Sequence, residues 1–121
     1  MTELVAVSAE IQMLRRLYEA FNEREIETVL AVMHSDVDWP NGWEGGRVHG
    51  KAAVRDYWTR QFEVLDPRVE PKTFVTEVDG RIAVDVHQVV HDKAGNLVVD
   101  QMVRHVYQIE DGLVRSMEIR P

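Results

Sequence analysis

The chain has 121 residues, 45% hydrophobic and 29% charged, which is the balance of a soluble globular protein with one domain over residues 1–121. The absence of cysteine excludes disulfides, thiolate metal sites and cysteine nucleophiles. A net charge of −7 argues against nucleic acid or an anionic membrane as a partner, because both repel an acidic surface. No apolar run approaches the roughly 20 residues that span a bilayer. The first ten residues carry two acids and no basic residue, unlike a secretory signal. We therefore expect a cytoplasmic protein.

The N-terminal half predicts three helices. Between Glu10 and Asn22 apolar residues recur at three- and four-residue steps, which indicates an amphipathic helix with Ser8 as its N-cap. A shorter helix is expected from Glu25 to Met33, and a third from Lys51 to Phe62 behind Gly50.

The segment between the second and third helices has a different character. Val37 and Trp39 alternate with acids, which suggests a short strand that Pro40-Asn41-Gly42 ends. Residues 43–46 then predict a mobile loop, because paired glycines have no preferred backbone conformation.

Everything after Arg68 predicts sheet. Four segments are rich in β-branched residues and alternate in polarity: Thr73–Val78, Arg81–His91, Leu97–Ile109 and Leu113–Ile119. Asp79-Gly80 and Asp111-Gly112 predict hairpin turns with positive φ at both turn positions. Helices followed by an antiparallel meander indicate an α+β domain with its helices on one face of the sheet.

The longest predicted strand has one face with polar groups in its middle. That face carries Val99, Gln101, Val103, His105, Tyr107 and Ile109, and the opposite face carries Asp100, Met102, Arg104, Val106 and Gln108. We expect the first face to be interior. A twisted sheet wrapped around three helices can leave a cavity at these polar groups.

Four stretches of the sequence occur in a familiar order: Leu17–Asn22 running into Glu25–Glu27, then Asp36–Trp39, Val48–Trp58 and Arg104–Val114. Together they resemble the SnoaL-like branch of the nuclear transport factor 2 fold, whose superfamily includes ketosteroid isomerases and polyketide cyclases. The resemblance covers nearly the whole chain. It implies a cone-shaped fold, with three N-terminal helices on a strongly curved antiparallel sheet, a deep apolar pocket and dimers that pack sheet against sheet. It specifies no reaction, because the family hosts isomerases, cyclases, hydrolases, dehydratases and binding modules.

The isomerase residues carry over only in part. In those enzymes an aspartate is the general base, and a tyrosine with a protonated aspartic acid forms the oxyanion hole. The base position falls on Asn41, whose amide accepts no proton near neutral pH. The tyrosine position falls on Leu17, next to Tyr18, and the late aspartic acid falls nearest to His105. We therefore do not expect steroid isomerisation by the familiar residues, although the polar replacements still suit binding and polarising a carbonyl.

The resulting catalytic candidates are His105, Tyr18 and Asn41. An inward-facing His105 would be mostly neutral and suited to acid/base work; alternatively, it is a core histidine satisfied by Tyr107, Tyr18 or water. Tyr18 and Asn41 would donate hydrogen bonds to an oxyanion. Asp38 is expected to point outward, and Glu44 lies on the loop.

The ligand-binding candidates form an aromatic set around the expected entrance, with a few neighbours. They are Trp39, Trp43, His49, Tyr57, Trp58, Phe62, Val103 and Tyr107. Trp43 is the candidate lid, since a loop aromatic is not needed for core packing. Tyr57 and Trp58 also have a packing interpretation, and His49 has a structural one at the start of the third helix.

No metal or other cofactor is expected. His87 and His91 have a zinc-like spacing, but that spacing brings ligands together on a helix. In a strand they would lie about 13 Å apart.

Three functions remain open. The first is a cofactor-free isomerase or cyclase that moves a proton on a small apolar carbonyl compound. The second is a non-catalytic small-ligand binder, favoured by the asparagine at the base position. The third is a dimerisation module, in which a homodimer through the outer sheet face, around Met102, Arg104 and Val106 with Val84 or His87, is the functional part.

Overall fold

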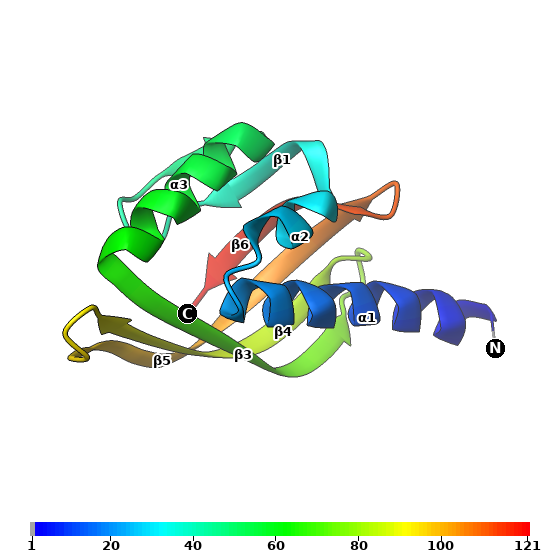
Figure 1. The fold of residues 1–121 in the computed structure, drawn as a ribbon. Coiled ribbons are helices and arrows are strands. Elements are labelled where there is room, and N and C mark those ends of the chain that lie inside the picture. The colour runs from blue at the N-terminus through cyan, green and yellow to red at the C-terminus, as the bar shows by residue number, and fades with distance from the viewer. Residues whose placement is uncertain (1) are drawn as a thin grey trace.

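The structure, a computed structural model, describes the backbone of residues 2–121 and the side chains of residues 9–121. The elements follow in the order α1 (Thr2–Asn22), α2 (Ile26–Ala31), β1 (Met33–Pro40), β2 (Arg47–His49), α3 (Lys51–Val64), β3 (Leu65–Thr76), β4 (Ile82–Asp92), β5 (Leu97–Glu110) and β6 (Leu113–Arg120). Figure 1 shows the three helices on one side of a curved sheet, with the N-terminal part of α1 extending beyond it. None of the described helices is both long and apolar enough to cross a membrane.

The strands form one sheet in the order β2-β1-β6-β5-β4-β3. All neighbours are antiparallel except β1 and β6, which run parallel. The predicted α+β class and the meander from β3 to β6 are confirmed.

Several predicted boundaries were wrong. The first helix begins at Thr2, so Ser8 lies inside it and is not its N-cap, and the second ends at Ala31, before Met33. The sequence analysis missed β2 altogether. The third helix starts where expected, after Gly50, whose φ of 86° suits glycine.

Strand β3 begins at Leu65, eight residues earlier than predicted, and includes Pro67 and Pro71. Proline usually argues against a strand because it cannot donate to the ladder. Here β3 is an edge strand. The backbone N–H and C=O of Val69, which lies between the two prolines, face away from β4 and bond to the side chain of Asn22 at 2.9 and 2.7 Å. Pro67 and Pro71 lie two residues on either side of Val69, so their backbone nitrogens also face away from β4. Their lack of an N–H therefore costs no hydrogen bond between β3 and β4.

The two predicted Asp-Gly turns differ. At Asp111-Gly112 both residues have positive φ, 54° and 77°, as expected. At Asp79-Gly80 only the glycine does, because the connection is longer and closes through a bond from the Glu77 N–H to the Arg81 carbonyl. The expectation of two positive φ angles was wrong there.

The core fills the concave side of the sheet, under the helices. Cross-strand pairs such as Val84 with His105 and Ile82 with Tyr107 place the predicted interior face of β5 inward. On the opposite face Met102 is exposed, whereas Val106 is only 1% exposed. Val84 is fully buried on the inner face and therefore does not belong to the outer surface.

Candidate functional site

A cavity of about 240 Å³ lies between the concave face of the sheet and the helices. A void of about 150 Å³ is enough to hold benzene, so this one suits a ligand of one or two rings. All three tryptophans of the chain, Trp39, Trp43 and Trp58, line it. The other lining residues are Leu17, Tyr18, Phe21, Pro40, Gly42, Tyr57, Gln61, Leu65, Pro67, Val69, Gln88, Val90, Val98, Val99, Gln101, His105, Tyr107, Met117 and Ile119.

The described residues that line the cavity carry no formal charge. Among the described residues that line it there is no aspartate, glutamate, lysine or arginine. Its polar groups are tyrosine hydroxyls, glutamine amides, one imidazole and the indole N–H groups of the three tryptophans. Desolvating a charged ligand here would go uncompensated, so the lining selects for neutral compounds.

The deep end of the cavity holds three polar rings in hydrogen-bond contact. The Tyr18 hydroxyl lies 2.7 Å from Nδ1 of His105, and the Tyr107 hydroxyl lies 2.8 Å from that of Tyr18. Tyr18 comes from α1, whereas His105 and Tyr107 come from alternate positions of β5 and therefore face the same way. All three are buried, with 1%, 6% and 0% of their surfaces exposed, respectively.

Burial sets the protonation of this cluster. It lowers the pKa of His105 from 6.5 to about 4, because the charged imidazolium loses its hydration. Burial likewise raises the pKa of Tyr18 and of Tyr107 well above the usual value for a phenol. At neutral pH the site therefore contains a neutral imidazole and two neutral phenols.

Two of the lining residues, Gln88 and Gln101, face each other across β4 and β5 and share a 2.9 Å hydrogen bond between their amides. A shallow hollow adjoins the cavity, sharing both glutamines and adding the charged side chains of Arg47 and Glu118. Charge is thus present in this hollow but not among the described residues that line the cavity.

Asn41 does not line the cavity, contrary to the expectation of an oxyanion donor. Its Oδ1 accepts hydrogen bonds from the backbone N–H groups of Trp43 and Glu44, at 3.2 and 2.7 Å. Its Nδ2 donates to the Glu44 carboxylate, which also pairs with Arg60 at 2.6 Å. Asn41 therefore fixes the shape of the entrance loop, and Glu44 is held outside.

Trp43 sits on this loop at the cavity edge, 39% exposed. We expect Trp43→Ala to weaken ligand binding roughly five- to thirtyfold, because stacking and apolar contact with a ligand ring are lost, worth about 1–2 kcal/mol. Calorimetric titration with any bound compound measures the change. Val78→Ala is the matched control, since Val78 is also exposed, does not line the cavity and lies in the turn between β3 and β4. Equal affinity of the two variants would exclude Trp43 as a lid.

Seven of the predicted residues line the cavity: Tyr18, Trp39, Trp43, Tyr57, Trp58, His105 and Tyr107. Three other binding candidates do not. His49 is exposed on β2, Phe62 packs against Phe21 with ring centroids 5.4 Å apart, and Val103 belongs to the core. The sequence analysis missed Gln88 as a lining residue. Its alternation with Val84 and Val86 on β4 was the available signal.

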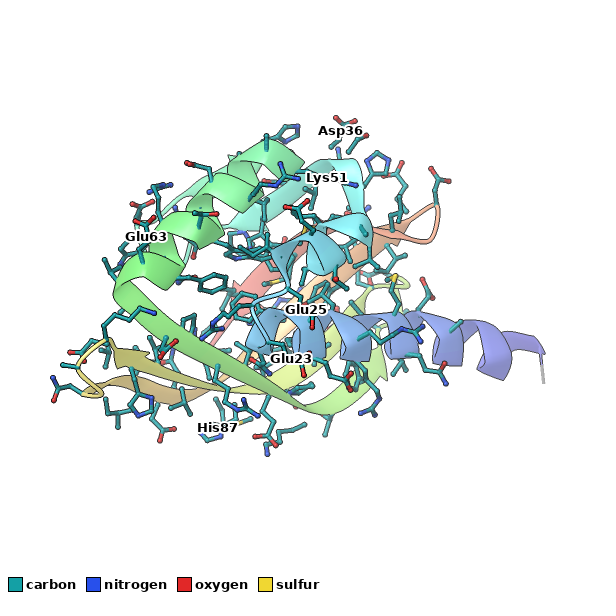
Figure 2. The ribbon with its side chains drawn as sticks, in the orientation of Figure 1. Glu23, Glu25, Asp36, Lys51, Glu63 and His87 are labelled. Atoms are coloured by element: carbon teal, nitrogen blue, oxygen red, sulfur yellow. The ribbon has the colours of Figure 1, made fainter. Side chains whose placement is uncertain are left out.

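The predicted absence of a metal can be tested against two places. His87 bonds Asp100 at 2.7 Å on the outer face of the sheet, where Figure 2 shows it on the side away from the helices. In the part of the chain that the structure describes, a histidine and two acids gather only at His34, Glu110 and Asp111. There the His34 Nδ1 accepts the backbone N–H of Asp36, and Glu110 pairs with Arg115.

We therefore expect protein purified without chelator to contain no stoichiometric zinc or iron, and its melting temperature to be unchanged by EDTA. Elemental analysis and thermal unfolding check this. Stoichiometric metal that is lost on replacing His34 or His87 would show that the expectation is wrong.

Several solved structures share this architecture. An NTF2-like protein of unknown function from Burkholderia pseudomallei is 26% identical, with a TM-score of 0.80 over 93% of this chain and 89% of that one. TerC, co-crystallised with polyporic acid, is 28% identical, with a TM-score of 0.79 over 92% and 89%. Rv0760c from Mycobacterium tuberculosis, in complex with estradiol-17β-hemisuccinate, shares the fold at 17% identity, with a TM-score of 0.79 over 92% of both chains. No curated protein matches the sequence.

The fold and its internal cavity thus define an NTF2-like α+β protein. The SnoaL-like domain model matches residues 14–117, and the chain belongs to that family.

Proposed function

We propose that this protein binds a neutral, largely apolar carbonyl compound in its cavity and polarises the carbonyl oxygen at His105. The reaction served would be a cofactor-free isomerisation or cyclisation in which His105 stabilises the oxyanion and the transferred proton passes to water or to another group of the substrate. The observation that carries the proposal is an uncharged aromatic cavity whose polar end contains a neutral imidazole. A neutral imidazole can stabilise a developing oxyanion in a dry site.

Solved structures of this fold with small organic compounds support a small-molecule ligand. TerC was crystallised with polyporic acid and Rv0760c with estradiol-17β-hemisuccinate. Both names denote acids, so the preference for a neutral compound is inferred from the uncharged lining of this cavity alone. An isomerase or cyclase is one of the activities that this fold accommodates, and the family itself does not select among them.

A non-catalytic binder is the second candidate, and one observation favours it. Asn41 stands at the base position of the related isomerases, and no carboxylate among the described residues lines the cavity. A protein without a strong base can still sequester a ligand.

Binding and turnover against one panel separate the two candidates. Apolar ketones and aromatic polyketides of one or two rings are titrated while tryptophan fluorescence is followed, since all three tryptophans line the cavity. Mass spectrometry of the same mixtures detects conversion. Binding with conversion supports the isomerase or cyclase, binding without conversion supports the binder, and no binding across the panel refutes both.

We also propose that two copies associate through the outer face of the sheet. Val75 and Met102 are 56% and 55% exposed there, beside the opposite charges of Arg104 and Asp85. A two-fold axis would bring the same apolar and charged groups together from both copies. We expect a dimer at micromolar concentration in sedimentation, and a monomer for Met102→Glu. A wild-type monomer of 14.0 kDa would refute the interface.

A further inference from the structure

The three rings at the deep end of the cavity carry three polar protons, and each needs a hydrogen-bond acceptor. Tyr18 and Tyr107 each carry one hydroxyl proton, and neutral His105 carries one proton on either Nδ1 or Nε2. Among the described residues, the three polar groups have hydrogen-bond contacts only with one another, Tyr107 to Tyr18 and Tyr18 to Nδ1. The tyrosines are at most 1% exposed, so solvent has little access to their hydroxyls.

Only one arrangement gives both hydroxyl protons an acceptor. Tyr107 donates to the Tyr18 oxygen, and Tyr18 donates to Nδ1 of His105, so the imidazole proton sits on Nε2. If Nδ1 carried the proton instead, it would donate to Tyr18. One phenol proton would then have no acceptor in a buried site, which disfavours that arrangement roughly tenfold or more.

The Nε2–H group of His105 is the one N–H of this cluster that has no partner inside it. Among the described residues, every fully buried side-chain nitrogen or oxygen has a hydrogen-bond partner. Nε2 of His105 has no partner within the part of the protein that the structure describes, so it is not fully buried. Since His105 lines the cavity, Nε2 is the atom that meets a ligand there.

We propose that Tyr18, backed by Tyr107, holds His105 as the Nε2–H tautomer, so that the cluster of three rings presents one hydrogen-bond donor, Nε2–H, to the cavity. This inference rests on the proposed function for the location of the ligand. His105 then acts as an electrophile toward an acceptor oxygen such as a ketone or quinone carbonyl. It is not a base, because the Tyr18 hydroxyl occupies its only lone pair.

The hydrogen-bonded series of Tyr107, Tyr18 and His105 also has no group that passes a proton to solvent. Tyr107 is fully buried, and burial raises its pKa, so it has no proton to supply in place of one lost from His105. His105 therefore polarises the oxygen and keeps its own proton. Tyr18 is a positioning residue, since it acts through His105.

The ligand preference follows from the donors and acceptors that His105 offers. A carbonyl oxygen accepts from Nε2–H and leaves nothing unpaired. An alcohol of the same shape also brings a hydroxyl proton, which finds no acceptor on His105. We expect the ketone of a matched ketone–alcohol pair to bind roughly tenfold more tightly.

The tautomer can be read directly in the ligand-free protein. In ¹⁵N-histidine-labelled protein at pH 7, long-range proton–nitrogen correlations show which ring nitrogen carries the hydrogen, and His105→Gln identifies the His105 signals. We expect Nε2–H. A dominant Nδ1–H signal would overturn the inference, whether or not any compound binds. Conversely, failure of the whole panel to bind refutes the proposed function while the tautomer is still measured.

Two variants isolate the positioning role, because each removes one hydroxyl from the same cluster. In Tyr107→Phe, Tyr18 still donates to Nδ1, so the Nε2–H signal and the ketone preference should persist. In Tyr18→Phe the lock is gone, and we expect the ketone preference to fall several-fold. Equal losses in the two variants, or none in Tyr18→Phe, would reduce Tyr18 to a packing role and overturn the proposal.

Discussion

Replacing His105 with alanine is expected to lower turnover of a carbonyl substrate by about 10²- to 10³-fold, the usual loss when one preorganised donor to an oxyanion is removed. The effect is large because His105 is the one histidine in a cavity lining without charge. It should appear mainly in kcat, since the hydrogen bond strengthens as negative charge develops on the oxygen. For a non-catalytic binder, the same change should weaken ketone affinity by roughly 5- to 30-fold, because one hydrogen bond is lost.

His105→Gln is the matched variant. A glutamine amide offers one oxygen to accept from Tyr18 and an N–H₂ group to donate toward the ligand, so it preserves both contacts of the imidazole without its basicity. We expect it to retain most of the activity that alanine loses. Circular dichroism at pH 7 must first show that both variants are folded, because alanine leaves Tyr18 without its partner. Activity of His105→Ala equal to that of wild type would exclude His105 from the chemistry.

Protonation of the buried imidazole is expected to cost folding stability in acid. The pKa of His105 is about 4 in the folded chain against 6.5 for an ordinary histidine, because burial disfavours the charged form. Between these two values the unfolded chain binds a proton that the folded chain does not, so stability rises with pH across this window and falls as pH drops through it. The part due to His105 is about 3 kcal/mol, present above pH 6.5 and gone by pH 4.

Urea unfolding at pH 7 and pH 4 measures this linkage when wild type is compared with His105→Gln. The carboxylates titrate in both proteins and cancel in the difference, so the wild type should lose about 3 kcal/mol more than the variant. Equal losses would mean that the imidazole is hydrated in the folded chain and does not lie at a desolvated deep end.

The sequence predicted the buried polar residues of the cavity better than the loop beside it. Alternation along β5 placed His105 and Tyr107 on the interior face, because strand geometry leaves a residue two faces only. The helical spacing of Tyr18 pointed the same way. The contact among the three rings joins residues 87 and 89 positions apart, and no local pattern encodes such a pairing.

Asn41 shows where the sequence was insufficient. Alignment with the isomerases assigned Asn41 a position in the chain but not the direction of its side-chain amide. In the structure the amide oxygen accepts hydrogen bonds from the loop backbone at Trp43 and Glu44. Short-range side-chain bonds of this kind depend on the loop conformation, which the sequence pattern left open. The start of β3 was missed for a related reason. The prolines that normally exclude a strand are harmless when their missing donors lie on its free side.

That free side of β3 has a consequence for the behaviour of the chain in concentrated solution. A sheet margin normally offers a row of unsatisfied donors and acceptors onto which another polypeptide can add as an extra strand. Here Pro67 and Pro71 supply no donor, and Asn22 occupies the N–H and C=O of Val69 between them. The opposite margin, β2, is only three residues long. Strand addition is thus blocked along residues 67–71 and has little backbone to use at β2, so growth into fibrils through these margins is disfavoured.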